Sequence, residues 1–107
     1  MPTQPILIAG SWRSANASST FRAENPATKE PLPEEYPVST WADCEAALAA
    51  AQEAAAEMRT LSGEKLAAFL EAFATKIEAR KDDLVTLANL ETALPVSPRL
   101  ADGELPR

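Results

Sequence analysis

The chain contains no histidine among its 107 residues. Histidine is the commonest general base, the usual partner of a nucleophilic serine or cysteine, and the commonest metal ligand. Its absence removes most catalytic constellations at once. A zinc site would need several Cys or His ligands, and Cys44 is the only cysteine. We therefore predict no catalytic and no metal-binding residue in this chain.

Glycine and long apolar runs are also scarce. Gly10, Gly63 and Gly103 lie tens of residues apart, so the sequence forms no Gly-rich phosphate loop or dinucleotide fingerprint. No stretch approaches the roughly 20 apolar residues of a membrane-spanning helix. The N-terminus lacks the positive charges and apolar region of a secretory signal, and a single cysteine fits a reducing compartment. We therefore expect a cytoplasmic protein with no cofactor-binding residue and no membrane partner.

Positive charge is the third feature in short supply. The formal net charge is -6, which argues against nucleic acid as a partner because phosphate binding relies on clustered Lys and Arg. The basic residues Lys76, Arg80 and Lys81 do lie close together, but acidic residues at 78, 82 and 83 alternate with them. This pattern is typical of a solvated helix face of mixed charge.

The first third of the chain predicts short strands followed by a connector. Residues 6–23 contain β-prone segments around a turn at Gly10, with 20–23 as a third strand of one small sheet. Residues 24–38 hold prolines at 26, 31, 33 and 37, each without a backbone N–H. We expect this proline-rich stretch to be an extended connector.

The first predicted helix covers residues 40–58. The Thr40 hydroxyl is expected to accept from amides of the first turn, and Asp43 suits the positive end of the helix dipole. The stretch that follows is rich in alanine and lacks Gly and Pro, so its helix propensity is high.

The second predicted helix covers residues 62–93. It begins at Ser62 and carries an apolar stripe with helical spacing, which consists of Leu66, Phe69, Leu70, Phe73 and Ile77. The phase of the stripe is lost at Arg80, which predicts a kink or a new helix near 82. Pro95 and Pro98 are expected to end the helix, with no closing element after them.

Four features remain as candidate chemistry. Cys44 near a helix start is a possible nucleophile, although a small buried apolar residue is the commoner role of a lone cysteine. The pairs Glu34-Glu35 and Asp82-Asp83 are potential proton or cation sites, but such pairs are ordinarily solubilising or capping features. Trp12 and Trp41 can stack on a ligand ring, but we expect them to anchor the small core.

The order of several motifs resembles the opening of the aldehyde dehydrogenase family. Leu7-Ile8-Ala9-Gly10-Ser11-Trp12, Phe21 and Asn25-Pro26-Ala27-Thr28-Lys29-Glu30 are similar to the family's β-hairpin with a Gly turn and its N-P-A-T-G-E connector. The alanine-rich stretch from Thr40, the Leu61-Ser62 start and Leu90-Glu91-Thr92-Ala93-Leu94-Pro95 resemble its "A-x-x-A-A" helix, "S-x-x-x-R" start and "E-T-G-x-P" end.

The resemblance implies an α/β enzyme fold, of which these 107 residues form a single N-terminal α+β segment: strands followed by two or three helices. It implies NAD(P)-dependent oxidation of an aldehyde by the complete enzyme. The catalytic cysteine, glutamate, asparagine and coenzyme loop of the family lie downstream, so none is carried onto a position here. The implied role is support of the coenzyme-binding domain. Its implied partner is the rest of the enzyme chain or its homo-oligomer, and NAD or NADP is expected only there.

Three positions depart from the family pattern. Lys29 and Ala93 replace glycines that favour a left-handed backbone, so we expect strain or rearrangement at both, and Lys65-Leu66 replaces the basic pattern after the helix start. The closing Arg99-Leu100 and Gly103-Glu104 resemble bacterial, often NADP-preferring enzymes that oxidise 2-oxoglutarate semialdehyde. The alternatives are a free-standing helical interaction module that uses the apolar stripe, and a small enzyme in its own right, which would show turnover by the pure chain.

Overall fold

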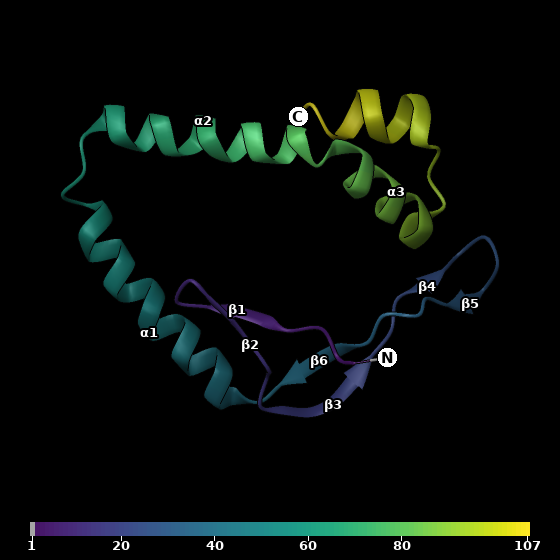
Figure 1. Cartoon of the computed structure of the whole chain (residues 1–107), viewed down its shortest axis with the longest axis horizontal. Helices are drawn as coiled ribbons and strands as arrows, with labels where there is room; N and C mark the ends of the chain where they lie inside the picture. The colour runs from purple at the N-terminus through teal and green to yellow at the C-terminus, as the bar shows by residue number, and fades with distance from the viewer. Residues whose placement is uncertain (1) are drawn as a thin grey trace. The chain divides into compact units, whose positions relative to one another are not determined.

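A computed structural model describes residues 2–107 (Figure 1), and the chain divides into two compact units. The first unit consists of Met1–Arg22 and Pro33–Ser62, and the second of Ala23–Leu32 and Gly63–Arg107. This differs from the single segment expected from the sequence, because part of the expected connector folds with the later helices.

The first hairpin pairs β1 (Ile6–Ile8) with β2 (Ser11–Arg13) in antiparallel register. Its two-residue turn consists of Ala9 and Gly10, whose φ angles are 52° and 77°. Two positive φ values in a two-residue loop match the right-handed twist of the flanking strands. The turn expected at Gly10 therefore forms, with Ala9 sharing the left-handed conformation.

The second strand pair corrects two expectations. β3 (Ala17–Phe21) begins earlier than predicted and pairs with β6 (Tyr36–Ser39), which lies in the expected connector, rather than with the first hairpin. Pro37 is tolerated in β6 because each strand of a two-stranded sheet is an edge strand. Phe21 stacks on Tyr36 across the pair with ring centroids 5.6 Å apart, a contact that sequence periodicity does not reveal.

A third small hairpin, β4 (Glu24–Asn25) with β5 (Glu30–Pro31), also lies in the expected connector. Its turn is held by the Asn25 Oδ1 atom, which accepts from the Ala27 amide at 2.9 Å. Lys29 has a φ of 61°, so the left-handed position expected there is confirmed. Leu32, directly after the hairpin, is one of four buried apolar residues of the described chain.

The first helix, α1 (Trp41–Met58), has no side-chain cap. The Thr40 Oγ1 atom is buried and has no hydrogen-bond partner, so the predicted capping role of Thr40 is wrong. The buried Asp43 carboxylate instead accepts from the Asn16 amide at 2.8 Å, and the Asn16 carbonyl accepts from the Thr40 amide at 2.9 Å. These two hydrogen bonds tie the loop before β3 to the start of α1.

The second predicted helix is divided into α2 (Gly63–Ala79) and α3 (Lys81–Thr92). Arg80 separates them with a non-helical backbone, close to the break expected near 82. Ala93 ends α3 with a φ of 58°, so its predicted left-handed conformation is confirmed as well. The Asn89 side chain then donates to the Leu94 carbonyl at 2.8 Å and fixes the chain after the helix end.

The expectation of no closing element after Pro98 is wrong. A helical segment, η1 (Val96–Glu104), follows with π-type hydrogen bonds from the Leu100 amide to the Pro95 carbonyl and from the Leu105 amide to the Leu100 carbonyl. Ser97 is not helical, and the Ser97-Pro98 peptide bond is cis. A proline is tolerated in a first helical turn, where its missing N–H has no intrahelical partner. Leu100 is buried where η1 contacts α3, which contributes the buried Val85.

Candidate functional site

Most large apolar side chains of the chain lie exposed. Only four apolar residues are buried within residues 2–107, and they are Ile8, Leu32, Val85 and Leu100. Sixteen large apolar residues are exposed, distributed over β1, β2, β3, β6, all three α-helices and the segment up to Val96. Where exposed apolar side chains gather into a large patch on one element, the patch ordinarily marks an interaction site.

The apolar stripe of α2 is the most continuous of these surfaces. Phe69, Leu70 and Phe73 are each more than half exposed, while Leu66 and Ile77 are half-buried. The Phe69 and Phe73 rings stack with centroids 6.4 Å apart, so one face of the helix presents an ordered aromatic pair. The sequence predicted this stripe, and the structure leaves it largely uncovered within its own unit.

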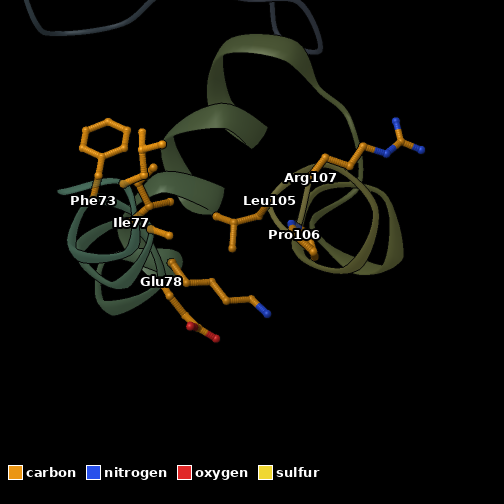
Figure 2. Close-up of a pocket in the computed structure, with 9 residues that line it drawn as sticks. Phe73, Ile77, Glu78, Leu105, Pro106 and Arg107 are labelled. Carbon is orange, nitrogen blue, oxygen red and sulfur yellow. The ribbon is translucent and has the colours of Figure 1, made fainter. Parts of the chain in front are cut away.

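A groove lies along the C-terminal part of this stripe, with a volume of about 440 Å³ (Figure 2). Phe73 and Ile77 line it from α2, and Leu105 and Pro106 line it from the segment that follows η1. The lining also contains the charged residues Glu78, Lys81 and Arg107. Sequence reasoning missed this groove because its second wall comes from the segment for which no structure was expected.

The residues expected to form the core near the N-terminus do not do so. Trp12 is 69% exposed and lies opposite Leu7 in the β1–β2 register, on a face that stays open to solvent. Trp41 is 68% exposed. The two tryptophans therefore do not anchor a core in this structure, which corrects that expectation. The buried residue of α1 is instead Asp43, whose carboxylate accepts a hydrogen bond from the Asn16 amide.

Cys44 is exposed, one position after Asp43, so the expected burial of this cysteine is also wrong. Its backbone amide donates to the Thr40 carbonyl at 3.4 Å as part of the first helical turn. No histidine exists to serve it as a base.

The two carboxylate pairs, Glu34-Glu35 and Asp82-Asp83, lie beside backbone hydrogen bonds and an ion pair. Glu34 and Glu35 are half-buried, and the Glu35 carbonyl accepts from the Gln4 amide at 2.8 Å. Asp83 forms an exposed ion pair with Arg80 at 3.3 Å in the first turn of α3, where negative charge suits the helix dipole. No cluster of three or more potential metal ligands occurs within residues 2–107.

The three glycines occupy unrelated places. Gly10 lies in the first hairpin turn, Gly63 at the start of α2 and Gly103 in η1. A dinucleotide site needs a Gly-rich turn between a strand and a helix, with backbone amides aimed at the phosphates. These glycines do not fit NAD or NADP. That the chain holds no catalytic, cofactor-binding or metal-binding residue stays a prediction. No helix in the described part of the chain is long and apolar enough to span a membrane.

Comparison with known proteins gives the class to which these elements belong. The sequence model of the aldehyde dehydrogenase family matches residues 12–105, which is nearly the whole chain. The chain therefore belongs to the aldehyde dehydrogenase family. The match begins at Trp12 in β2 and ends at Leu105, beyond η1, so it includes elements of both units.

Three individual members of that family illustrate how similar the chain is to its relatives. It is 31% identical over 107 residues to an aminoaldehyde dehydrogenase of Arabidopsis thaliana, covering 95% of this chain and 21% of that protein. It is 36% identical over 92 residues to the alpha-ketoglutaric semialdehyde dehydrogenase 2 of Azospirillum brasilense, covering 85% and 18%. A succinate-semialdehyde dehydrogenase [NADP(+)] of Schizosaccharomyces pombe is 33% identical over 91 residues, covering 85% and 18%. The chain spans about a fifth of the length of these relatives.

Proposed function

We propose that this chain is the N-terminal structural segment of an NAD(P)-dependent aldehyde dehydrogenase and is inactive alone. The observation that carries the proposal is the match over residues 12–105 to a family whose curated relatives are about five times longer. Their remaining four fifths have no counterpart here. Oxidation of an aldehyde to a carboxylic acid then belongs to the complete enzyme.

The exposed apolar surfaces support a docking role within that enzyme. Trp41 and Leu48 on α1 are exposed, as are Phe69, Leu70 and Phe73 on α2. Covering such side chains contributes about 25 cal/mol per Å² of apolar surface removed from water. We propose that the rest of an aldehyde dehydrogenase chain covers these helix faces, in the same polypeptide or in a partner of a homo-oligomer.

A chimera tests this proposal. Residues 1–107 replace the matched N-terminal part of the Azospirillum brasilense enzyme, and aldehyde-dependent reduction of NAD(P) is measured on the purified protein. We expect a soluble, active oxidoreductase. A second chimera with Phe69→Ser and Leu70→Ser is expected to lose solubility and activity together, whereas a control with Glu71→Gln, on the same helix, retains both. An insoluble or inactive first chimera would count against the proposal.

The substrate and the coenzyme of the complete enzyme are proposed from similarity to one group of relatives. The closing Arg99-Leu100 and Gly103-Glu104 and the 36% identity to an alpha-ketoglutaric semialdehyde dehydrogenase support a bacterial enzyme that oxidises 2-oxoglutarate semialdehyde with NADP. Relatives named for aminoaldehydes and for betaine aldehyde are 31% and 29% identical. To distinguish these substrates, the native gene is expressed and the mass of its intact product is measured. The kcat/KM values of the complete enzyme for the three aldehydes are then compared. Preference for betaine aldehyde would reject the assignment.

A free-standing interaction module is the second candidate, favoured by the ordered Phe69–Phe73 pair on the exposed stripe. The two proposals differ in the behaviour of the 107-residue chain alone. A supporting segment is expected to unfold at low denaturant or to self-associate, because its apolar faces lack partners. A cooperatively folded monomer with a sharp thermal transition would favour the module instead. We propose a cytoplasmic location for either, testable by fractionation of the native host.

A further inference from the structure

The helical segment η1 contains the one place in the sequence where an aspartate precedes a glycine, at Asp102-Gly103. Asp102 is exposed, and its Oδ2 atom accepts from the Ser97 hydroxyl at 3.3 Å. Because glycine has no Cβ atom, no side chain shields the Gly103 nitrogen that follows the Asp102 carboxyl group. A residue with a Cβ atom follows each of the other three aspartates, which are Asp43, Asp82 and Asp83.

Few interactions hold η1 in its helical conformation. Leu100 is the buried residue of this segment, at the place where η1 contacts α3. The ion pair between Arg99 and Glu104, at 2.9 Å, is more than one-third exposed on both sides, and exposed pairs contribute little to stability. Segments with few buried apolar contacts open locally at a lower free energy than the core. We therefore expect η1 to open without unfolding of the whole chain.

We propose that Asp102 and Gly103 form a site of spontaneous aspartyl isomerisation, which the opening of η1 controls. In the closed segment, the helical backbone holds the Gly103 nitrogen away from the geometry of ring closure. In the open segment, this nitrogen attacks the Asp102 Cγ atom and a new C–N bond forms. The carboxyl hydroxyl group leaves together with the Gly103 amide proton as one water molecule. The product is a succinimide ring, and no group is oxidised or reduced.

Water then opens the ring at one of its two carbonyl carbons. Attack at the former side-chain carbonyl restores aspartate. Attack at the former main-chain carbonyl breaks the original peptide C–N bond and gives isoaspartate, whose main chain runs through Cγ and is longer by one carbon atom. We expect the longer chain to lose the hydrogen bond from the Leu105 amide to the Leu100 carbonyl. The modification then keeps η1 open. This site is independent of the role assigned to the chain in an aldehyde dehydrogenase.

Ageing of the 107-residue chain in buffer, with and without urea, tests the proposal. Protease digests are separated by chromatography, and electron-transfer fragmentation distinguishes isoaspartyl from aspartyl peptides of equal mass. We expect isoaspartate at residue 102, preceded by a peptide lighter by one water, and none at the other three aspartates. It should form at least about tenfold more slowly in the folded chain than in urea. Equal rates in the two conditions would overturn control by η1, and equal isoaspartate at all four aspartates would overturn the site itself.

Two variants test the chemistry of the ring. Gly103→Ala places a Cβ atom beside the attacking nitrogen and is expected to slow isomerisation severalfold in urea. In the folded chain this Cβ atom would lie 3.6 Å from the Pro98 carbonyl oxygen, an ordinary contact, so η1 should still form. Asp102→Glu would have to close a larger ring and is expected to show no loss of water at this position. Isomerisation that Gly103→Ala leaves unchanged in urea would contradict the proposed attack.

A further pair of variants tests the control by η1. Arg99→Gln removes the ion pair to Glu104 and is expected to raise the rate in the folded chain about twofold, with no change in urea. Arg13→Gln, at an exposed position of β2, is the matched control and should change neither rate.

Leu100→Ala provides a stronger perturbation of the same segment. It is expected to bring the rate in the folded chain close to the rate in urea, because Leu100 is buried against α3. Far-UV circular dichroism of each variant records how much helix remains when its rate is compared. If Arg99→Gln and Leu100→Ala both left the folded rate unchanged, the opening of η1 would not control the reaction.

Discussion

The Asn16 amide donates to the Asp43 carboxylate across 27 positions of the sequence, at 2.8 Å. Asp43 is the one charged side chain that is buried within the described residues, at 8% exposure. A buried carboxylate is costly unless it accepts hydrogen bonds, and this one orients the start of α1 toward the loop before β3. The link between a loop and a helix is therefore polar rather than apolar.

Asp43→Ala should destabilise the first unit. The substitution leaves the Asn16 amide without its acceptor, which costs about 1–3 kcal/mol of unfolding free energy. Urea unfolding followed by tryptophan fluorescence measures the change, since both tryptophans belong to the first unit. Glu45→Ala, at an exposed position two residues further along the same helix, serves as the control and should shift the midpoint little. Equal effects of the two substitutions would show that the hydrogen bond contributes nothing specific.

Thr40→Val should be neutral or stabilising by up to about 1 kcal/mol, because the Thr40 hydroxyl is buried without a partner. At a helix start where the hydroxyl caps the first turn, removing it ordinarily costs about 1 kcal/mol. The sign of the change in unfolding free energy therefore separates the two situations. A loss near the capping value would mean that Thr40 caps α1 in solution.

Two substitutions to glycine should stabilise the protein. Lys29 and Ala93 both have left-handed backbones, with φ of 61° and 58°, which cost a residue with a Cβ atom about 1 kcal/mol. Lys29→Gly and Ala93→Gly should each raise the unfolding free energy by somewhat less than this, since glycine also makes the unfolded chain more flexible. Ala72→Gly, in the interior of α2, should lower it by about 1 kcal/mol. Glycine that destabilises all three positions alike would rule out strain at the turns.

Leucine truncation should separate folding from docking. Leu100→Ala removes a side chain that is 6% exposed and should cost about 2–5 kcal/mol, enough to unfold much of the second unit. Leu70→Ala removes one that is 63% exposed and should change the stability of the isolated chain little. In the chimera with the remainder of an aldehyde dehydrogenase, Leu70→Ala should instead reduce stability and activity. If Leu70→Ala left the stability and activity of the chimera unaffected, the α2 stripe would not be a docking face.

Sequence patterns predicted local features of this fold well. The Ala9-Gly10 turn, the helix from Trp41, the stripe of α2 and the left-handed Lys29 and Ala93 each depend on neighbouring residues, and each is present. These signals come from backbone conformation and from helical periodicity. Both are readable from a few consecutive residues.

Features that depend on distant partners were missed. The pairing of β3 with β6 brings Phe21 against Tyr36, and no local sequence pattern predicts which strand pairs with β3. From the sequence, Asp43 is an ordinary acidic residue in the first turn of a helix. Its role as acceptor for the Asn16 amide is visible only in the structure. The groove was missed for the same reason, because Leu105 follows two prolines that obscured the helical segment before it.

The discontinuous makeup of the two units limits how this polypeptide can be divided. The chain passes from one unit to the other after Arg22, after Leu32 and after Ser62. A gene cut at the last of these points yields one product with the β4–β5 hairpin but without its helices. The other product then lacks the Leu32 side chain that its unit buries. The N-terminal product keeps the whole first unit, whereas the second unit is complete in neither product, so a cut after Ser62 disrupts the second unit alone.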